Sequence, residues 1–312
     1  MASPLRHFFI ALSKSPQLQD LIVGFPVSRR AARRFIAGER LEDAIDAIRA
    51  TNATGMVATL DFLGEHVHSE AEARANADEY IRALSAINQA GVDANISIKL
   101  TGMGLAVDDE FCYQNVRRIV QMAADLGNFV RIDMEDSPVT DRTIAIYRRL
   151  RGEFDNTGLV LQAYLFRTES DVCRLMEEGQ AHLRLCKGAY DEPPAVAWQE
   201  KADVDRSLVS LMKFMLDSRD AYPGTYPALA SHDHMIINWT KAYAYTHGIT
   251  PDRFEFQMLY GIRRDLQQQL ADQGYRMRVY IPYGTRWYPY YMRRLAERPA
   301  NVVFFARAMF GN

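Results

Sequence analysis

Cysteine and long hydrophobic runs are both scarce in this sequence of 312 residues. The three cysteines, Cys112, Cys173 and Cys186, form no Cys-x-x-Cys pair, and their odd number leaves no complete set of disulfides. No stretch approaches the ~18 consecutive apolar residues of a membrane-spanning helix. Residues 1–15 lack the basic start, long apolar core and small-residue cleavage site of a secretory signal. We therefore expect a protein of the reducing cytoplasm.

A strong excess of charge of either sign is absent as well. The sequence has 37 Lys and Arg residues against 39 Asp and Glu residues, which gives a net charge of −2. This balance gives no electrostatic reason to expect nucleic acid as a partner. Basic pairs recur, but acidic residues are interspersed among them, which favours solvated helix faces over a polyanion site. The pairs are Arg29-Arg30, Arg33-Arg34, Arg117-Arg118 and Arg148-Arg149.

What the sequence does contain is eight short apolar and β-branched runs separated by helical patterns. A run without polar alternation is typical of a strand covered on both faces, as in a parallel sheet. Strand and helix repeated eight times predict an α/β protein with a (β/α)8 TIM-type barrel, whose chemistry lies at the C-terminal ends of the strands. The runs are Met56–Phe62, Ala94–Leu100, Phe129–Asp133, Gly158–Tyr164, His182–Lys187, Ala228–His232, Phe254–Leu259 and Met277–Pro282.

The chain is longer than a barrel of roughly 250 residues requires. Residues 1–50 have helical patterns and are too few to bury a separate core, so we expect an N-terminal helical arm there and a catalytic barrel over 51–312. The arm carries two Arg pairs and the cluster Phe8-Phe9-Ile10, so contact with a membrane surface or a partner subunit is a further hypothesis.

Charged residues end two neighbouring strands of the predicted barrel. Lys99 lies in an apolar run, where burial is costly unless the amine meets an anion. Asp133 ends the next run and alternates with Arg131, so both should face the same side. The sequence predicts a Lys99–Asp133 ion pair at the barrel mouth. Whether this pair is structural or part of a ligand site stays open at this point.

The fifth run contains two cations, Arg184 and Lys187, which need anionic partners if buried. A phosphate-bearing cofactor would supply such charge, and Gly188 would let a ligand approach the backbone. A Schiff base at Lys187 is the competing interpretation. The amide of Gln162, at the end of the fourth run, suits the edge of a heteroaromatic ring, although a hydrogen-bonded core glutamine fits equally well.

The last predicted helix, Trp287–Glu297, has two adjacent arginines that can converge on one small anion. Arg293 and Arg294 are one turn beyond Tyr290 and can bind a carboxylate through planar guanidinium groups. A surface basic pair is the alternative. A metal site is not expected, because His66, His68 and His232 do not complete a set of ligands.

Together these segments resemble the proline dehydrogenase family, over almost the entire predicted barrel. The resemblance is to the short, monofunctional bacterial form, and we expect no aldehyde dehydrogenase portion after residue 312. It implies a distorted barrel that holds FAD without a Rossmann fold, and Gly102-Met103-Gly104 indeed lacks the third glycine of G-x-G-x-x-G. The most specific segments are Arg184–Tyr190, Phe254–Gln257 and Tyr290–Glu297.

The resemblance also implies a role for each site residue. Asp133 and Arg184 are the implied catalytic residues: Asp133 orients the cations, and Arg184 lies near the flavin N5. Substrate binding falls to Lys99, Arg293 and Arg294 for the carboxylate, to Tyr280, Tyr290 and Leu259 as a wall, and to Glu65, which pairs with Arg293 to close the site. The implied FAD contacts are Met134, Gln162, Arg184, Lys187, Gly188, Ala189, Tyr190, Ser231 and His232.

The implied reaction is the oxidation of L-proline to Δ1-pyrroline-5-carboxylate, by hydride transfer from C5 to FAD N5. We further expect a quinone acceptor, peripheral contact with the inner membrane, and coupling to a separate pyrroline-5-carboxylate dehydrogenase. Two other classes remain as alternatives: an aldolase-like barrel that forms a Schiff base at Lys187, and a non-catalytic scaffold.

Overall fold

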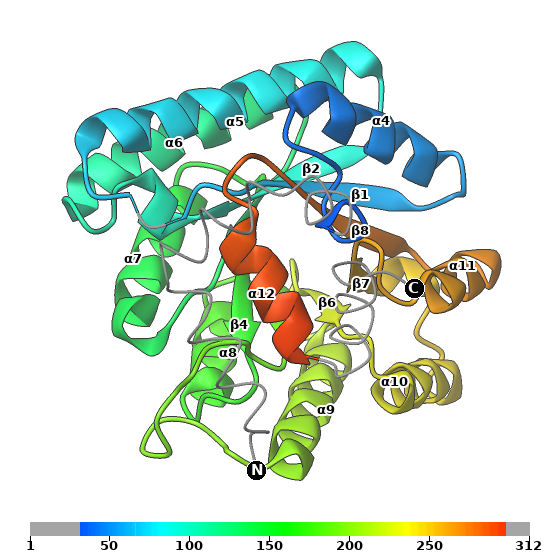
Figure 1. Ribbon diagram of the computed structural model, residues 1–312. Helices are drawn as coiled ribbons and strands as arrows, with labels where there is room; N and C mark the ends of the chain where they lie inside the picture. Colours follow the sequence, from blue (N-terminus) through cyan, green and yellow to red (C-terminus); the bar gives the residue numbers. More distant parts are fainter. Residues whose placement is uncertain (1–31, 66, 298–312) are drawn as a thin grey trace.

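Eight parallel strands form a closed barrel in the computed structural model, which describes residues 32–65 and 67–297 (Figure 1). The strands follow one another around the barrel in chain order, and β8 pairs with β1 to close it. The predicted TIM-type barrel is therefore confirmed. The strands are β1 (Val57–Phe62), β2 (Ala94–Lys99), β3 (Val130–Asp133), β4 (Thr157–Gln162), β5 (His182–Cys186), β6 (Tyr226–Ala230), β7 (Glu255–Leu259) and β8 (Met277–Tyr283).

The strand β6 begins two residues earlier than the sequence predicts. Pro227 has no N–H to donate, and it occupies the second position of β6. The preceding Tyr226 anchors the strand by donating its N–H to the carbonyl oxygen of Ala181 at 3.0 Å. As a result β6 ends at Ala230, and Ser231 and His232 lie in the turn beyond it.

The strands do alternate between apolar and polar residues, contrary to the prediction of uniformly apolar runs. Outward residues such as Leu60, Ile96 and Ile132 are fully buried against the helices and form the hydrophobic core. Many inward positions are polar or charged, although Val160 and Ala228 share this face, so the barrel interior contains a layer of ionic contacts. The charged inward residues are Asp61, Lys99, Arg131, Asp133, Arg184, Glu255 and Arg278.

Seven helices connect consecutive strands and surround the barrel. They are α5 (Glu70–Ala90), α6 (Asp109–Asp125), α7 (Thr140–Arg151), α8 (Thr168–Glu177), α9 (Lys201–Ser218), α10 (His234–Thr246) and α11 (Arg264–Asp272). Short 3-10 turns η1 (Leu100–Met103), η2 (Ser137–Val139) and η3 (Pro251–Arg253) supplement them. None of the helices within residues 32–65 and 67–297 has the length and hydrophobicity needed to cross a membrane.

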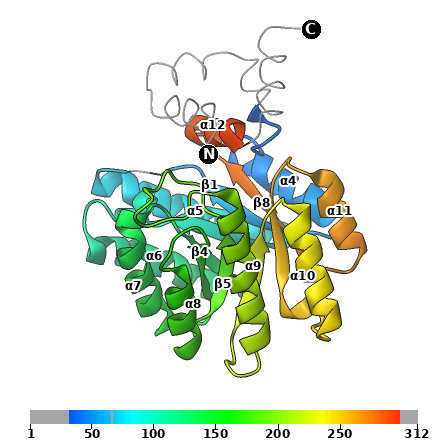
Figure 2. The same ribbon diagram turned by 90° about the horizontal axis from the view of Figure 1, so that it is seen from below.

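Seven connecting helices leave one position open in the ring around the barrel, and a helix that precedes β1 fills it. Helix α4 (Leu41–Asn52) packs against β8, β1 and α5. Helix α12 (Tyr288–Glu297), which follows β8, instead lies across the C-terminal end of the barrel (Figure 2). Residues 1–31 of the predicted arm, with Phe8-Phe9-Ile10, lie outside the described residues. The assignment of 1–50 as an arm thus stays a prediction.

Candidate active site

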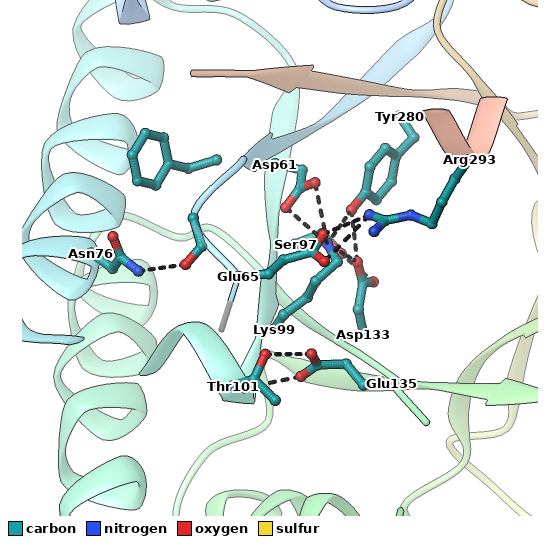
Figure 3. A network of polar contacts seen from close by, with 12 residues as sticks. Asp61, Glu65, Asn76, Ser97, Lys99, Thr101, Asp133, Glu135, Tyr280 and Arg293 are labelled. Atoms are coloured by element: carbon teal, nitrogen blue, oxygen red, sulfur yellow. Dashed lines mark hydrogen bonds and ion pairs between the residues drawn. The ribbon is translucent and has the colours of Figure 1, made fainter. Parts of the chain in front are cut away.

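Lys99 lies at the centre of a network that joins four strands at the C-terminal end of the barrel (Figure 3). Its Nζ lies 3.2 Å from both carboxylate oxygens of Asp61, 3.1 Å from Asp133 Oδ2 and 3.1 Å from the hydroxyl of Tyr280. The predicted Lys99–Asp133 pair is therefore present. Burial opposes the charge of Lys99, but Asp61, Tyr280 and Asp133 together raise its pKa well above the ordinary value.

Asp133 binds two cations and two hydroxyl groups. Arg184 Nη1 lies 2.8 Å from Oδ1, Ser97 Oγ donates to Oδ1 at 2.6 Å, and Tyr280 donates to Oδ2 at 2.7 Å. Burial alone would raise the pKa of this carboxyl group, but Lys99 and Arg184 outweigh it and lower the pKa below its usual value. Asp133 therefore stays ionised and holds both cations at the barrel mouth.

Asp61 is a member of this network that the sequence reasoning missed. Its side chain is about 1% exposed and contacts Lys99 and the hydroxyl of Tyr80, which donates at 3.2 Å. Burial raises the pKa of Asp61 to about 6, although Lys99 works in the opposite direction. The available signal was an acidic residue in an otherwise apolar run, which marks an inward position.

The predicted pair between Glu65 and Arg293 is also present. Arg293 lies on α12 and Glu65 lies in the loop after β1. The distance from Arg293 Nη2 to Glu65 Oε1 is 2.9 Å. Burial opposes the positive charge, but Glu65 raises the pKa of Arg293 above its ordinary value. The same Glu65 oxygen lies 3.7 Å from Lys99 Nζ. One carboxylate thus already sits between Lys99 and Arg293, and its contacts tie α12 to the barrel mouth (Figure 3).

Helix α12 buries two further predicted residues. Arg294 is 6% exposed and lies over the ring of Tyr290, with its guanidinium carbon 5.0 Å from the ring centre. Tyr290 is itself buried. A surface basic pair would be solvated, so burial of Arg294 and pairing of Arg293 exclude that alternative for these two arginines.

A second group of residues has buried polar atoms that the described part of the chain leaves unmatched. Arg184 Nε and Nη2 are buried and have no hydrogen-bond partner among the described residues, and the same holds for Gln162 Oε1. Gly188 adopts a φ of +112°, and a Cβ at this position would lie 2.4 Å from the ring of Tyr164. The unmatched donors and the acceptor suit the polar edge of a planar heteroaromatic ring. These residues therefore fit a flavin.

The structure places Lys187 away from the central network. Its Nζ lies 2.5 Å from Asp205 Oδ1 on α9 and 2.9 Å from Asp233 Oδ2, at the start of α10. A lysine that forms a Schiff base needs a neutral, accessible amine, whereas this one bridges two carboxylates. The described contacts thus give no support to the Schiff-base alternative.

The remaining predicted cofactor residues surround the mouth on the side of β3 to β7. His232 Nε2 accepts the N–H of Leu259 at 3.0 Å, which leaves the ring proton on Nδ1, and the buried Ser231 Oγ accepts the N–H of Asp233 at 3.1 Å. Burial and the nearby Glu65 raise the pKa of Tyr190 well above its usual value. Met134 is buried directly after β3, whereas Ala189 is exposed in the loop after β5.

Comparison with known proteins identifies the group to which this barrel belongs. A family model described as proline dehydrogenase matches residues 44–307. The chain belongs to the proline dehydrogenase family. Proline dehydrogenase 1 of Bacillus subtilis subsp. natto is 43% identical over 305 residues, which cover 98% of this chain and 99% of that protein. The proline dehydrogenase of Deinococcus radiodurans is 44% identical over 309 residues and 97% of each chain. Members of this family are flavin-dependent oxidoreductases that act on CH–NH groups.

A solved structure supports the same fold. Proline utilization A (PutA) from Bdellovibrio bacteriovorus, inactivated by N-propargylglycine, superimposes with a TM-score of 0.80 at 24% identity. The match covers 93% of this chain but 36% of that one, so the chain spans about a third of the length of that protein. The predicted family and barrel are both confirmed.

A buried carboxyl group beside the network makes the stability of the fold depend on pH. Glu135 accepts hydrogen bonds from the backbone N–H and the hydroxyl of Thr101, yet burial raises its pKa to about 7. A carboxyl group whose pKa is raised on folding holds its proton more tightly in the folded chain. It therefore stabilises the fold below about pH 4.5, and this contribution is lost as the pH rises to about 7.

We predict that Glu135→Gln, which keeps the group neutral, stabilises the protein at pH 8 by on the order of 3 kcal/mol and has little effect at pH 4.5. Urea unfolding of both proteins at the two pH values measures this difference. The exposed Glu169→Gln is the matched control and should show no such pH dependence. An equal effect of Glu135→Gln at both pH values would contradict the assignment.

Proposed function

We propose that this protein is an FAD-dependent proline dehydrogenase that oxidises L-proline to Δ1-pyrroline-5-carboxylate. The observation that carries the proposal is the position of the Glu65 carboxylate, 2.9 Å from Arg293 and 3.7 Å from Lys99 at the barrel mouth. A substrate carboxylate at this mouth would meet Lys99, Arg293 and the buried Arg294, while the pair between Glu65 and Arg293 closes the site. Arginine binds carboxylates with a geometry that suits this role.

The cofactor side of the site supports FAD as the oxidant. Arg184, Gln162 and Gly188 would hold the flavin ring, and the other predicted contacts would hold the rest of the cofactor. When bound, FAD supplies an acceptor at N5 for the hydride that leaves proline C5. Arg184 contributes a positive charge that Asp133 fixes in place, at a site where negative charge develops during the transfer.

The remaining residues orient the substrate and exclude water. Tyr280 is held by Lys99 and Asp133, so its ring forms a rigid part of the wall that Tyr290 and Leu259 complete. Fixing the carboxylate at one end of proline places C5 at the other end, next to the flavin. The proline nitrogen must lose its proton before C5 can release a hydride, so the reaction rate rises with pH.

The purified protein gives the most direct test of the activity. We expect a yellow protein whose flavin absorbance bleaches on anaerobic addition of L-proline and does not bleach with L-alanine, which lacks the ring. A colourless protein that gains no activity with added FAD would contradict the proposal, and so would a flavin spectrum that proline leaves unchanged.

The carboxylate site has its own test. We predict that Arg294→Met raises the KM for L-proline by about tenfold or more, because one charged hydrogen bond to the substrate is lost, and leaves the flavin content unchanged. The exposed Arg286→Met, in the loop before α12, is the matched control and should leave KM unchanged. Equal loss of flavin and proline affinity in Arg294→Met would contradict this assignment.

Reduced flavin must pass its electrons to a second substrate. We propose a quinone, reached by peripheral contact of this cytoplasmic protein with the inner membrane, and a separate dehydrogenase that consumes the product. The family resemblance supports this assignment. The test is to measure how fast the proline-reduced protein reduces ubiquinone in phospholipid vesicles. A flavin that is reoxidised no faster with ubiquinone than with oxygen alone would contradict this assignment.

A further inference from the structure

A cavity lies at the end of the barrel opposite the candidate active site. It has a volume of about 300 Å3 and is lined by residues at the beginnings of β5, β6, β7 and β8, and by Arg131 of β3. Parallel strands begin at one end of a barrel and finish at the other, so this cavity and Lys99 lie at opposite ends of the barrel.

Arg131 gives the cavity an unusual chemistry. The residue is 2% exposed, and its guanidinium group donates to the carbonyl oxygens of Leu159 and His182 and to His182 Nδ1. None of these partners is a carboxylate, and its Nε has no hydrogen-bond partner among the described residues. A buried charge without an anionic partner carries a desolvation penalty of several kcal/mol. Accordingly, burial and the charge of Arg184 lower the pKa of Arg131 to about 9.

The charge of Glu255 favours the positive charge of Arg131, but the ion pairs of Glu255 are with other arginines. Glu255 pairs with Arg278 at 2.9 Å and with Arg276 at 3.2 Å, so its negative charge is already shared by two arginines. The lining contains three arginines against two carboxylates, the second being Asp252. The cavity therefore has an excess of one positive charge.

One wall of the cavity is aromatic. The ring of His182 lies 4.6 Å from that of Phe129 and stacks at 4.9 Å on that of Tyr226. His182 accepts a hydrogen bond from Arg131, and burial lowers its pKa well below the usual value, so the ring is neutral. A bare inorganic anion would leave most of 300 Å3 and this wall without contacts.

We propose that this cavity, lined by Arg131, Arg276, Arg278, His182 and Tyr226, is a binding site for a small organic monocarboxylate. The carboxylate pairs with the guanidinium of Arg131, and the apolar body of the ligand lies against the aromatic wall. The ligand brings the one negative charge that the lining lacks. Binding therefore stabilises the folded protein and leaves the reaction at the other end of the barrel unchanged.

Calorimetric titration of the FAD-loaded protein with sodium benzoate, at constant ionic strength, tests the proposal. We expect a saturable site with one ligand per chain, together with a melting temperature that rises with benzoate concentration. Sodium phosphate is the comparison anion and should bind more weakly. Tighter binding of phosphate than of benzoate would overturn the assignment to an organic carboxylate.

Variants separate this site from the carboxylate site at the barrel mouth. Arg276→Gln changes a half-exposed residue, so the protein should fold. It removes one arginine and frees Glu255 to repel the ligand, so benzoate affinity should fall about tenfold while kcat and KM for proline stay unchanged. Arg131→Met should abolish binding, whereas Arg253→Gln, an exposed arginine paired with Asp220, should bind normally.

A variant of the substrate site gives the last test. Arg294→Met should retain benzoate binding in full, because Arg294 lies at the other end of the barrel. Benzoate affinity that is unchanged in Arg276→Gln and lost in Arg294→Met would overturn the proposal and assign the binding to the active site.

Discussion

The buried ammonium group of Lys99 is the constraint from which the rest of the site follows. A lysine on β2 that loses its water must be matched by negative charge, and Asp61 on β1 and Asp133 on β3 provide it from both sides. Two carboxylates exceed one ammonium, and Arg184 on β5 compensates the second. Charges of opposite sign thus alternate across the mouth as Asp61, Lys99, Asp133 and Arg184. Each side chain is held by its neighbours, so the cations are in place before any ligand arrives.

Much of this architecture was predictable from the sequence. Short apolar runs at regular spacing gave the strands, and the charged residues that end them gave the Lys99–Asp133 pair. Asp61 was missed because alternation along a strand shows which residues share a face but not which face points inward. In a barrel with an ionic interior, a buried aspartate looks like an interruption of an apolar run. The early start of β6 was missed for a similar reason, since Pro227 has the local signature of a strand boundary.

Contacts between segments far apart in the sequence were beyond such reasoning. Lys187 pairs with Asp205 in α9 and with Asp233, which directly precedes α10, and no local pattern connects these residues. The same is true of Arg131. Its alternation with Asp133 predicted a shared face, but the two residues lie at different depths of the barrel, one at the ligand mouth and the other in the opposite cavity. One face of the four-residue strand β3 thereby contributes one residue to the Lys99 network and one to the cavity at the opposite end of the barrel.

Helix α4, and not α12, fills the eighth position of the outer ring, so the two helices have different roles. Helix α4 completes the shell that buries β8 and β1, so its residues are constrained by packing. Helix α12 lies outside that ring and carries Tyr290, Arg293 and Arg294 over the mouth. It is also packed, because Tyr288 and Tyr291 are fully buried. A mutation that changes the ligand side of this helix must therefore also preserve its buried side chains.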